Sequence, residues 1–171
     1  MYPGSNSYDY RYSWNNYWHQ YYDWNNANWY LHNRNLELKD YGLRPLVINL
    51  EQAAKQNNNY RTTLWTGKHF QMTVMSINVG DDIGLEVHPT TDQYIRIEEG
   101  QGLVQMGDSK DRLDFQAMAS KDYAIIVPAG TWHNVTNTGH TPLKVSVIYA
   151  PPAHPFGTIH HTKADAAKAE K

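Results

Sequence analysis

The sequence predicts an all-β fold, a closed or two-sheet antiparallel barrel that spans residues 43–150. Short runs of alternating apolar and polar residues follow one another through this region. Gly, Pro, Asn and Asp separate these runs at intervals of about 8–12 residues, a spacing typical of sandwiches and barrels. The chain has 171 residues, of which 40% are hydrophobic, so one folded domain with a core is expected.

The elements are predicted in chain order from these runs. RPLVINL at 44–50 is predicted as a strand, and EQAAKQ at 51–56 as a short helix. The further predicted strands are TTLWT (62–66), HFQMTVMSINV (69–79), GLEVH (84–88), QYIRIEE (93–99), GLVQMG (102–107), RLDFQAM (112–118), YAIIV (123–127), HNVTNT (133–138) and PLKVSVIYA (142–150). The last residues, TKADAAKAEK at 162–171, favour a short solvated helix or a frayed tail.

Residues 1–35 have a different composition from the rest of the chain. They consist mainly of Tyr, Trp, Asn and Ser with almost no aliphatic residues, a low-complexity pattern that cannot build its own core. One interpretation is a disordered tail. The other is an aromatic-rich extension that docks on a barrel, that of a neighbouring subunit rather than its own, which predicts a homo-oligomer.

Composition excludes several classes of partner. The net charge is −2 and the basic residues are scattered, so no nucleic-acid partner is expected. The chain has no cysteine, which removes disulfides and thiolate metal ligands. It shows neither a signal peptide nor an apolar run long enough for a membrane span, so we expect a cytoplasmic protein with no membrane partner.

Two blocks of spaced polar residues and glycines stand out in the predicted strand region. The first contains Gly80, Glu86, His88, Gln93 and Gly100. The second contains Asp122, Pro128, Gly130, His133 and Asn137. In order and spacing these blocks resemble the two motifs of the cupin family, with the usual pair of strands between them.

The resemblance implies a jelly-roll barrel, or double-stranded β-helix, over residues 36–162, followed by a tail at 163–171. Within the family, the sequence is similar to the small single-domain bacterial cupins of the mannose-6-phosphate isomerase-like group. The family implies a metal in the barrel mouth, held by two histidines and a glutamate of the first motif and a histidine of the second. This chain departs from that pattern at Glu86, Gln93 and Asp122.

The candidate metal ligands are Glu86, His88, Gln93 and His133. Glu86 and His88 lie two residues apart on a predicted strand, so both side chains leave the same face. One carboxylate, two imidazoles and one amide oxygen suit a divalent transition metal, namely Mn, Fe, Co, Ni or Zn. The exchange of a histidine for Glu86 and of the glutamate for Gln93 leaves the net charge of the ligand set unchanged. The alternative is a metal-free ion pair between Glu86 and His133, with Gln93 completing the hydrogen bonds.

Two functions are consistent with this site. The first is a metal-dependent enzyme that acts on a small polar molecule, sugar-like or hydroxy-carbonyl, by isomerase, dioxygenase or lyase chemistry. Glu86 is a candidate base only where it is not fully committed to the metal. The second is a structural protein at a spore surface, with the barrel as scaffold and the aromatic extension for association, because residues 1–35 resemble spore-coat proteins in composition.

Other polar residues are assigned structural places. Asn137 is predicted to hydrogen-bond at a turn or strand end. His154 and the pair His160–His161 are predicted to lie on the surface. The neighbouring pairs 81–82 and 98–99, two acidic residues each, are predicted as loop charges or charges on a solvated face.

Overall fold

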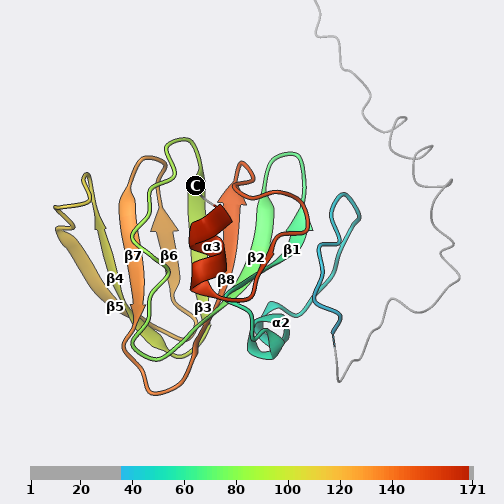
Figure 1. The fold of residues 1–171 in the computed structure, drawn as a ribbon, viewed down its shortest axis with the longest axis horizontal. Coiled ribbons are helices and arrows are strands. Elements are labelled where there is room, and N and C mark those ends of the chain that lie inside the picture. The colour runs from blue at the N-terminus through green and yellow to red at the C-terminus, as the bar shows by residue number, and fades with distance from the viewer. Residues whose placement is uncertain (1–35, 170–171) are drawn as a thin grey trace, which may run out of the picture. The chain divides into compact units, whose positions relative to one another are not determined.

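Two antiparallel β-sheets form the framework of residues 36–169, the part of the chain that the computed structural model describes (Figure 1). The large sheet has the strand order β6-β3-β8-β2-β1-β9, and the small sheet has the order β5-β4-β7. The strands are β1 (Arg61–Thr66), β2 (Gln71–Ile77), β3 (Asp92–Glu99), β4 (Gln101–Gly107), β5 (Phe115–Ser120), β6 (Ala124–Val127), β7 (Trp132–Asn137), β8 (Leu143–Ala150) and β9 (Ile159–His160). The helices are α2 (Leu50–Gln56) and α3 (Lys163–Ala169). The predicted all-β class is confirmed.

Most predicted strands correspond to observed ones, but two do not. The segment 44–49 is irregular rather than a strand, and the next residue, Leu50, begins α2. The Asn49 side chain accepts a hydrogen bond of 3.0 Å from the Gln52 backbone N–H, and this N-cap directs the chain into the helix. The predicted strand at 84–88 makes only an isolated bridge between Glu86 and His133.

The main hydrophobic core lies between the inner faces of the two sheets. Cross-strand register places Met75 opposite Val145, and Val145 opposite Ile97, so these side chains share the inner face of the large sheet. The small sheet contributes Val104 and Val135 to the same cluster. All five side chains are at most 2% exposed, so this end of the interior is closed by aliphatic packing.

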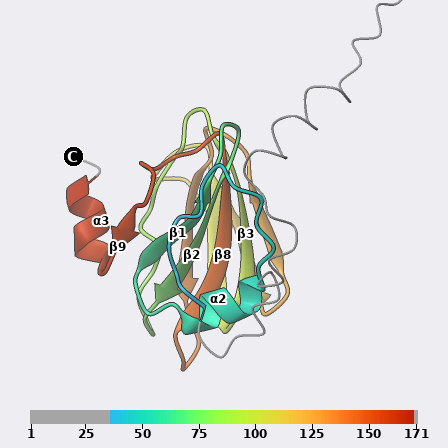
Figure 2. The ribbon, with the colours of Figure 1, turned by 90° about the vertical axis from the view of Figure 1, so that its right-hand side faces the viewer.

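The outer face of the large sheet is covered by α2. Figure 2 shows this helix in front of the lower part of β2 and β8. Ala53 and Ala54 of the helix form a second buried cluster with Leu64 and Val74, which point outward from β1 and β2. The middle of the large sheet is therefore packed on both faces, and this packing buries polar side chains such as Glu98 on the outer face.

The motif glycines occupy backbone positions that favour glycine. Gly80, Gly100 and Gly130 have φ angles of 75°, 94° and 79°. Asp122, which replaces a motif glycine, also has a positive φ of 73°. Aspartate tolerates this left-handed conformation better than most residues. The substitution therefore preserves the turn between β5 and β6, and the family spacing reflects backbone geometry.

The predictions about residues 1–35 lie outside the described residues. The docking of the aromatic extension on a neighbouring subunit and the homo-oligomer stay predictions. Between residues 36 and 169, neither helix has the length and apolar composition needed to cross a membrane.

Candidate metal centre

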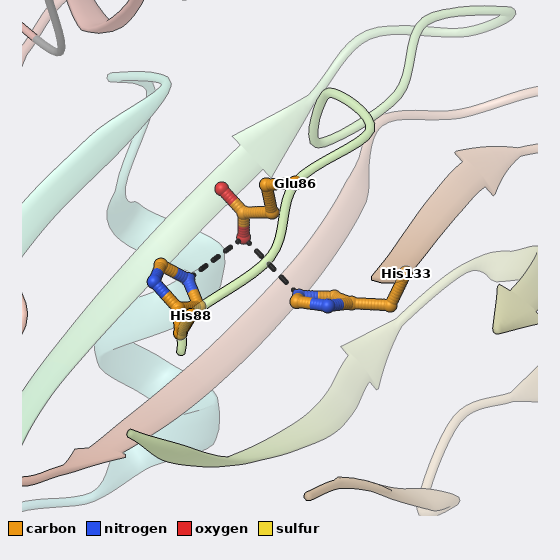
Figure 3. A group of neighbouring side chains, drawn as sticks. All are labelled: Glu86, His88 and His133. Carbon is orange, nitrogen blue, oxygen red and sulfur yellow. Dashed lines mark ion pairs between the residues drawn. The ribbon is translucent and has the colours of Figure 1, made fainter. Parts of the chain in front are cut away.

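Three side chains of the two motif regions converge on one point (Figure 3). The Glu86 Oε1 atom lies 3.3 Å from His88 Nε2 and 3.3 Å from His133 Nε2. The candidate ligand atoms of all three residues lie within 4.8 Å of one another. Figure 3 shows the carboxylate between the two imidazole rings. The predicted convergence of Glu86, His88 and His133 is present in the structure.

Backbone pairing holds Glu86 next to His133. The Glu86 N–H donates to the His133 carbonyl at 3.1 Å, and the His133 N–H donates to the Glu86 carbonyl at 2.9 Å. His88 lies two residues further along the same extended segment, just before Pro89. The Gly130 N–H donates to the His88 carbonyl at 2.8 Å, which ties this end of the segment to the turn before β7.

The His133 ring has a defined tautomer. Its Nδ1 atom lies 2.9 Å from the Thr131 carbonyl oxygen, which can only accept a hydrogen bond, so Nδ1 carries the proton. In the neutral ring the Nε2 atom therefore presents its lone pair to Glu86. A backbone carbonyl that fixes the far nitrogen in this way is the usual support of a metal-ligating histidine.

The atoms at the centre of this cluster lack hydrogen bonds. Glu86 Oε1, His88 Nε2 and His133 Nε2 are buried and have no hydrogen-bond partner among the described residues. A buried polar atom without a partner costs about 1–3 kcal/mol. A single proton could improve only one of the two contacts of Oε1, and two imidazolium rings at this distance would repel each other. One cation bound by all three atoms resolves both contacts, so the donor set fits a metal ion.

The charge on Glu86 is consistent with this arrangement. Burial by itself raises the pKa of a carboxyl group, but contacts with His133 and His88 and the positive charge of Arg61 outweigh it. The pKa of Glu86 therefore lies below its usual range, and the group is an anionic ligand at neutral pH.

Gln93 lies on β3 and is 3% exposed. Its Oε1 atom is buried and has no hydrogen-bond partner in the described part of the chain. The Glu86–His133 ion pair of the metal-free alternative is present at 3.3 Å, but Gln93 Oε1 does not complete its hydrogen bonds. Gln93 pairs with Tyr149 across β3 and β8, which puts both side chains on the inner face, and its role as fourth ligand stays a prediction.

The prediction that His154 and His160 lie on the surface is wrong. The His154 ring packs edge-on against the buried Tyr149 at a centroid distance of 4.9 Å, and Tyr149 packs against His88 at 5.5 Å. His160 is 9% exposed because β9 pairs with β1, an interaction that the sequence did not reveal. The sequence does contain a signal for the burial of Tyr149, because Tyr149 follows Val145 and Val147 at intervals of two residues along β8.

Other structural predictions are settled by the same contacts. Asn137 ends β7, and its side chain donates to the Ile77 and Thr141 carbonyls and accepts from the Gly139 N–H, as predicted. The prediction that Glu98 is solvated is wrong, since it is 0% exposed.

Comparisons with known proteins converge on one family. A family model described as "Cupin domain" matches residues 73–149. The protein YrkC of Bacillus subtilis (strain 168) is 66% identical over 137 residues, which cover 80% of this chain and 74% of YrkC. The residues that the family model matches include both motif blocks.

Solved structures show the same fold. The crystal structure of BH2720 from Bacillus halodurans is 59% identical, with a TM-score of 0.75, and covers 76% of this chain and 98% of that one. A Klebsiella pneumoniae protein with a double-stranded β-helix domain is 16% identical, with a TM-score of 0.54, and the match covers 70% of this chain and 100% of that one. The second likeness shows the fold alone.

Proposed function

Because the chain belongs to the cupin superfamily, we propose that it binds a divalent transition metal in the barrel interior and acts there as an enzyme on a small polar molecule. Glu86, His88 and His133 would hold the metal, with Gln93 as a fourth ligand. The substrate class is sugar-like or hydroxy-carbonyl.

One observation carries the proposal: a single carboxylate oxygen faces two imidazole nitrogens at 3.3 Å, and none of the three atoms has a hydrogen-bond partner among the described residues. Buried polar atoms in a stable interior normally have at least one hydrogen bond. The protein leaves them directed at a common point, which is the arrangement that a cation requires.

The side chains around this point suit a ligand rich in oxygen atoms. When bound, a divalent metal supplies a Lewis acid that polarises a carbonyl or hydroxyl oxygen. Burial raises the pKa of Tyr149 to about 12, so its hydroxyl keeps its proton and can donate to a ligand oxygen. Gln93 offers an amide on the same face as Tyr149. These residues would bind and orient a hydroxylated or carbonyl-bearing molecule.

Metal analysis tests the proposal. The protein is purified without chelators or an affinity tag, and its metal content is measured by inductively coupled plasma mass spectrometry. We expect about one equivalent of transition metal per chain, because three to four protein ligands suffice for tight binding. His133→Ala should lose this metal, whereas His140→Ala, which alters an exposed histidine, should retain it. A metal content that is equally low in all three proteins, even after reloading, would contradict the proposal.

A further inference from the structure

A further histidine, His154, reaches the interior from the segment that follows β8. Its ring packs edge-on against Tyr149 at a centroid distance of 4.9 Å, and Tyr149 packs against His88 at 5.5 Å. The His154 Nε2 atom is buried and has no hydrogen-bond partner among residues 36–169. His154 belongs to neither motif block and is not part of the cluster that could hold a metal. A bound metal therefore does not account for this unsatisfied atom.

The side chain of Gln71 fixes the backbone of His154. Its Nε2 group donates to the His154 carbonyl at 2.9 Å, and its Oε1 atom accepts from the His154 N–H at 3.0 Å. Gln71 is 0% exposed, so both hydrogen bonds are shielded from water and hold the segment firmly. Because Gln71 anchors the backbone and Tyr149 packs against the ring, His154 has a defined place although it lies outside the strands and helices.

The anchor of His154 belongs to the same cross-strand row as the candidate fourth ligand. Tyr149 on β8 pairs with Gln93 on β3 and with Gln71 on β2. Residues directly opposite each other on neighbouring strands project from the same face of a sheet. Gln93, Tyr149 and Gln71 therefore form one inward-facing row, with the candidate ligand at one end and the anchor of His154 at the other.

The chemistry of the His154 ring favours a hydroxyl group as its partner. Burial, and after it the charge of Arg61, lowers the pKa of His154 to about 3, so the ring is neutral at neutral pH. The Nε2 atom of a neutral ring accepts or donates according to the tautomer, and a hydroxyl group can pair with either form. A carboxylate only accepts and an ammonium group only donates, and a neutral ring offsets the charge of neither. An ordered water molecule would also satisfy this atom and is the alternative to a ligand hydroxyl.

We propose that His154 binds the substrate, and that its Nε2 atom forms a hydrogen bond with a hydroxyl group of a polyhydroxylated carbonyl compound. The carbonyl and a neighbouring hydroxyl of this compound would lie toward Glu86, His88 and His133. This inference deepens the proposed function and rests on it, because the metal would hold the other end of the ligand. It narrows the substrate class to hydroxy-carbonyl compounds that carry at least one further, uncharged hydroxyl group.

Isothermal titration calorimetry on the Zn²⁺-loaded full chain tests the inference with two pairs of probes. One pair is dihydroxyacetone with hydroxyacetone. The other is erythrulose with the hydroxybutanone that lacks its two hydroxyl groups on the far side of the carbonyl. Both members of a pair keep the carbonyl and one neighbouring hydroxyl, so they differ only in the groups that could reach His154. In at least one pair we expect the more hydroxylated member to bind about fivefold or more tightly, as one added hydrogen bond predicts.

His154 variants identify the group responsible. His154→Phe keeps an aromatic ring against Tyr149 and removes the nitrogen, so the affinity ratio within the pair should fall below about twofold. The affinity for the less hydroxylated member should stay within about threefold, because that probe makes no contact with the nitrogen. His154→Gln offers an amide in place of the imidazole nitrogen and should retain part of the ratio. His140→Phe, at an exposed histidine, is the matched control and should keep the full ratio.

A second measurement applies where His154→Phe does not fold. Proton–nitrogen NMR of the Zn²⁺-loaded wild type follows the histidine ring nitrogens, and the His154 signals are assigned by their absence from His154→Gln. These signals should shift when the more hydroxylated probe is added and should stay in place with its partner. Equal shifts with both members of a pair would overturn the inference.

The outcomes separate the two proposals because metal content is measured on the same samples. A wild-type protein that holds metal but binds both members of each pair equally, or binds none of the four probes, overturns the inference and leaves the metal proposal intact. A ratio that is unchanged in His154→Phe also overturns it and assigns the Nε2 atom to a water molecule. A ratio that depends on His154 in protein that takes up no metal supports the contact with His154 and overturns the metal proposal.

Discussion

Glu98 is a fully buried carboxylate and Glu86 a largely buried one, and their surroundings differ strongly. Glu98, on the outward side of β3, is 0% exposed and accepts a hydrogen bond of 2.6 Å from the Ser146 hydroxyl. Its other oxygen pairs with the Arg96 guanidinium. Glu86, in the interior, faces two imidazoles without a hydrogen bond to its Oε1 atom among the described residues.

The difference indicates what each carboxylate is for. The outer group has its partners within the protein, so it needs nothing further, and its role is to hold β3 and β8 together. Around the inner group, three further atoms have no hydrogen bond to any described residue, namely His88 Nε2, His133 Nε2 and Gln93 Oε1. The fold satisfies the buried Glu98 with hydrogen bonds, whereas Glu86 Oε1 has only its two contacts with imidazole nitrogens, which is consistent with a site for a cation.

The largest expected difference between the two carboxylates is in metal-dependent stability. A divalent metal present at about a thousandfold excess over its dissociation constant should raise the free energy of unfolding by about 4 kcal/mol. Glu86→Gln should abolish this increment and Glu98→Gln should retain it. Denaturant titrations with Zn²⁺ or Mn²⁺, and again with a chelator, measure both. An equal increment in the two variants would erase the proposed distinction.

Removal of one imidazole should act on metal affinity rather than on folding. If about 10–16 kcal/mol of binding free energy is shared among four ligands, His133→Ala should lose about 3 kcal/mol, or two orders of magnitude in affinity. Competition titration against a chromophoric chelator measures the loss, and His140→Ala serves as the control. A His133→Ala protein that unfolds more easily yet binds metal as before would assign the cluster a structural role.

The outer carboxylate should show the opposite pattern. Glu98→Gln removes the charge that faces Arg96 and should lower the free energy of unfolding by about 2 kcal/mol, without changing metal content. The neighbouring Glu99 is 45% exposed, and Glu99→Gln is the matched control with little expected effect. Urea denaturation of the metal-free proteins tests this. The prediction fails if the two variants are equally stable.

We expect acid to lower the free energy of unfolding through His154, which lies beside the buried Tyr149. Burial, followed by the charge of Arg61, lowers the pKa of His154 to about 3, while histidine in the unfolded chain titrates near its ordinary pKa of 6.5. The unfolded state therefore binds more protons between these values, and stability falls as the pH decreases from 6.5 toward 3. At pH 5.5 the loss attributable to His154 is about 1.4 kcal/mol.

His154→Gln should remove this part of the pH dependence in the metal-free protein, and His140→Gln should not. Stability measured by urea denaturation at pH 7.5 and at pH 5.5 gives the comparison. Parallel pH profiles for the wild type and His154→Gln would contradict the assignment of a buried neutral imidazole.

The smallest expected effect on stability concerns Asp122, which contacts the Arg96 guanidinium that pairs with Glu98. Asp122 contacts Arg96 at 2.6 Å but is itself 64% exposed, so this ion pair contributes about 0–1 kcal/mol. Asp122→Gly loses that contact and relieves a positive φ, and the two effects should cancel to within about 1 kcal/mol. Thermal denaturation measures the change. A loss above about 2 kcal/mol would mean that Asp122 is needed to hold Arg96 against Glu98.

Local pattern was sufficient to predict most of the framework and part of the site. Alternation with a period of two placed Glu86 and His88 on one face, and motif spacing placed His133 near them. The same reasoning failed at 44–49, where an N-cap overrode apolar content, and at Glu98. Alternation places Glu98 on the face opposite Ile97, but it does not reveal that α2 packs on that face of the sheet.

The sequence by itself predicted most of the strands, the turns between them, and three of the polar side chains that converge, Glu86, His88 and His133. Only the tertiary structure decided which other polar residues share that interior. Arg61, Tyr149 and His154 come from β1, β8 and the segment after β8, and they meet because β2 pairs with both β1 and β8. Period-two alternation shows that a strand has two different faces. The long-range pairing of strands decides which of these faces points toward the metal centre.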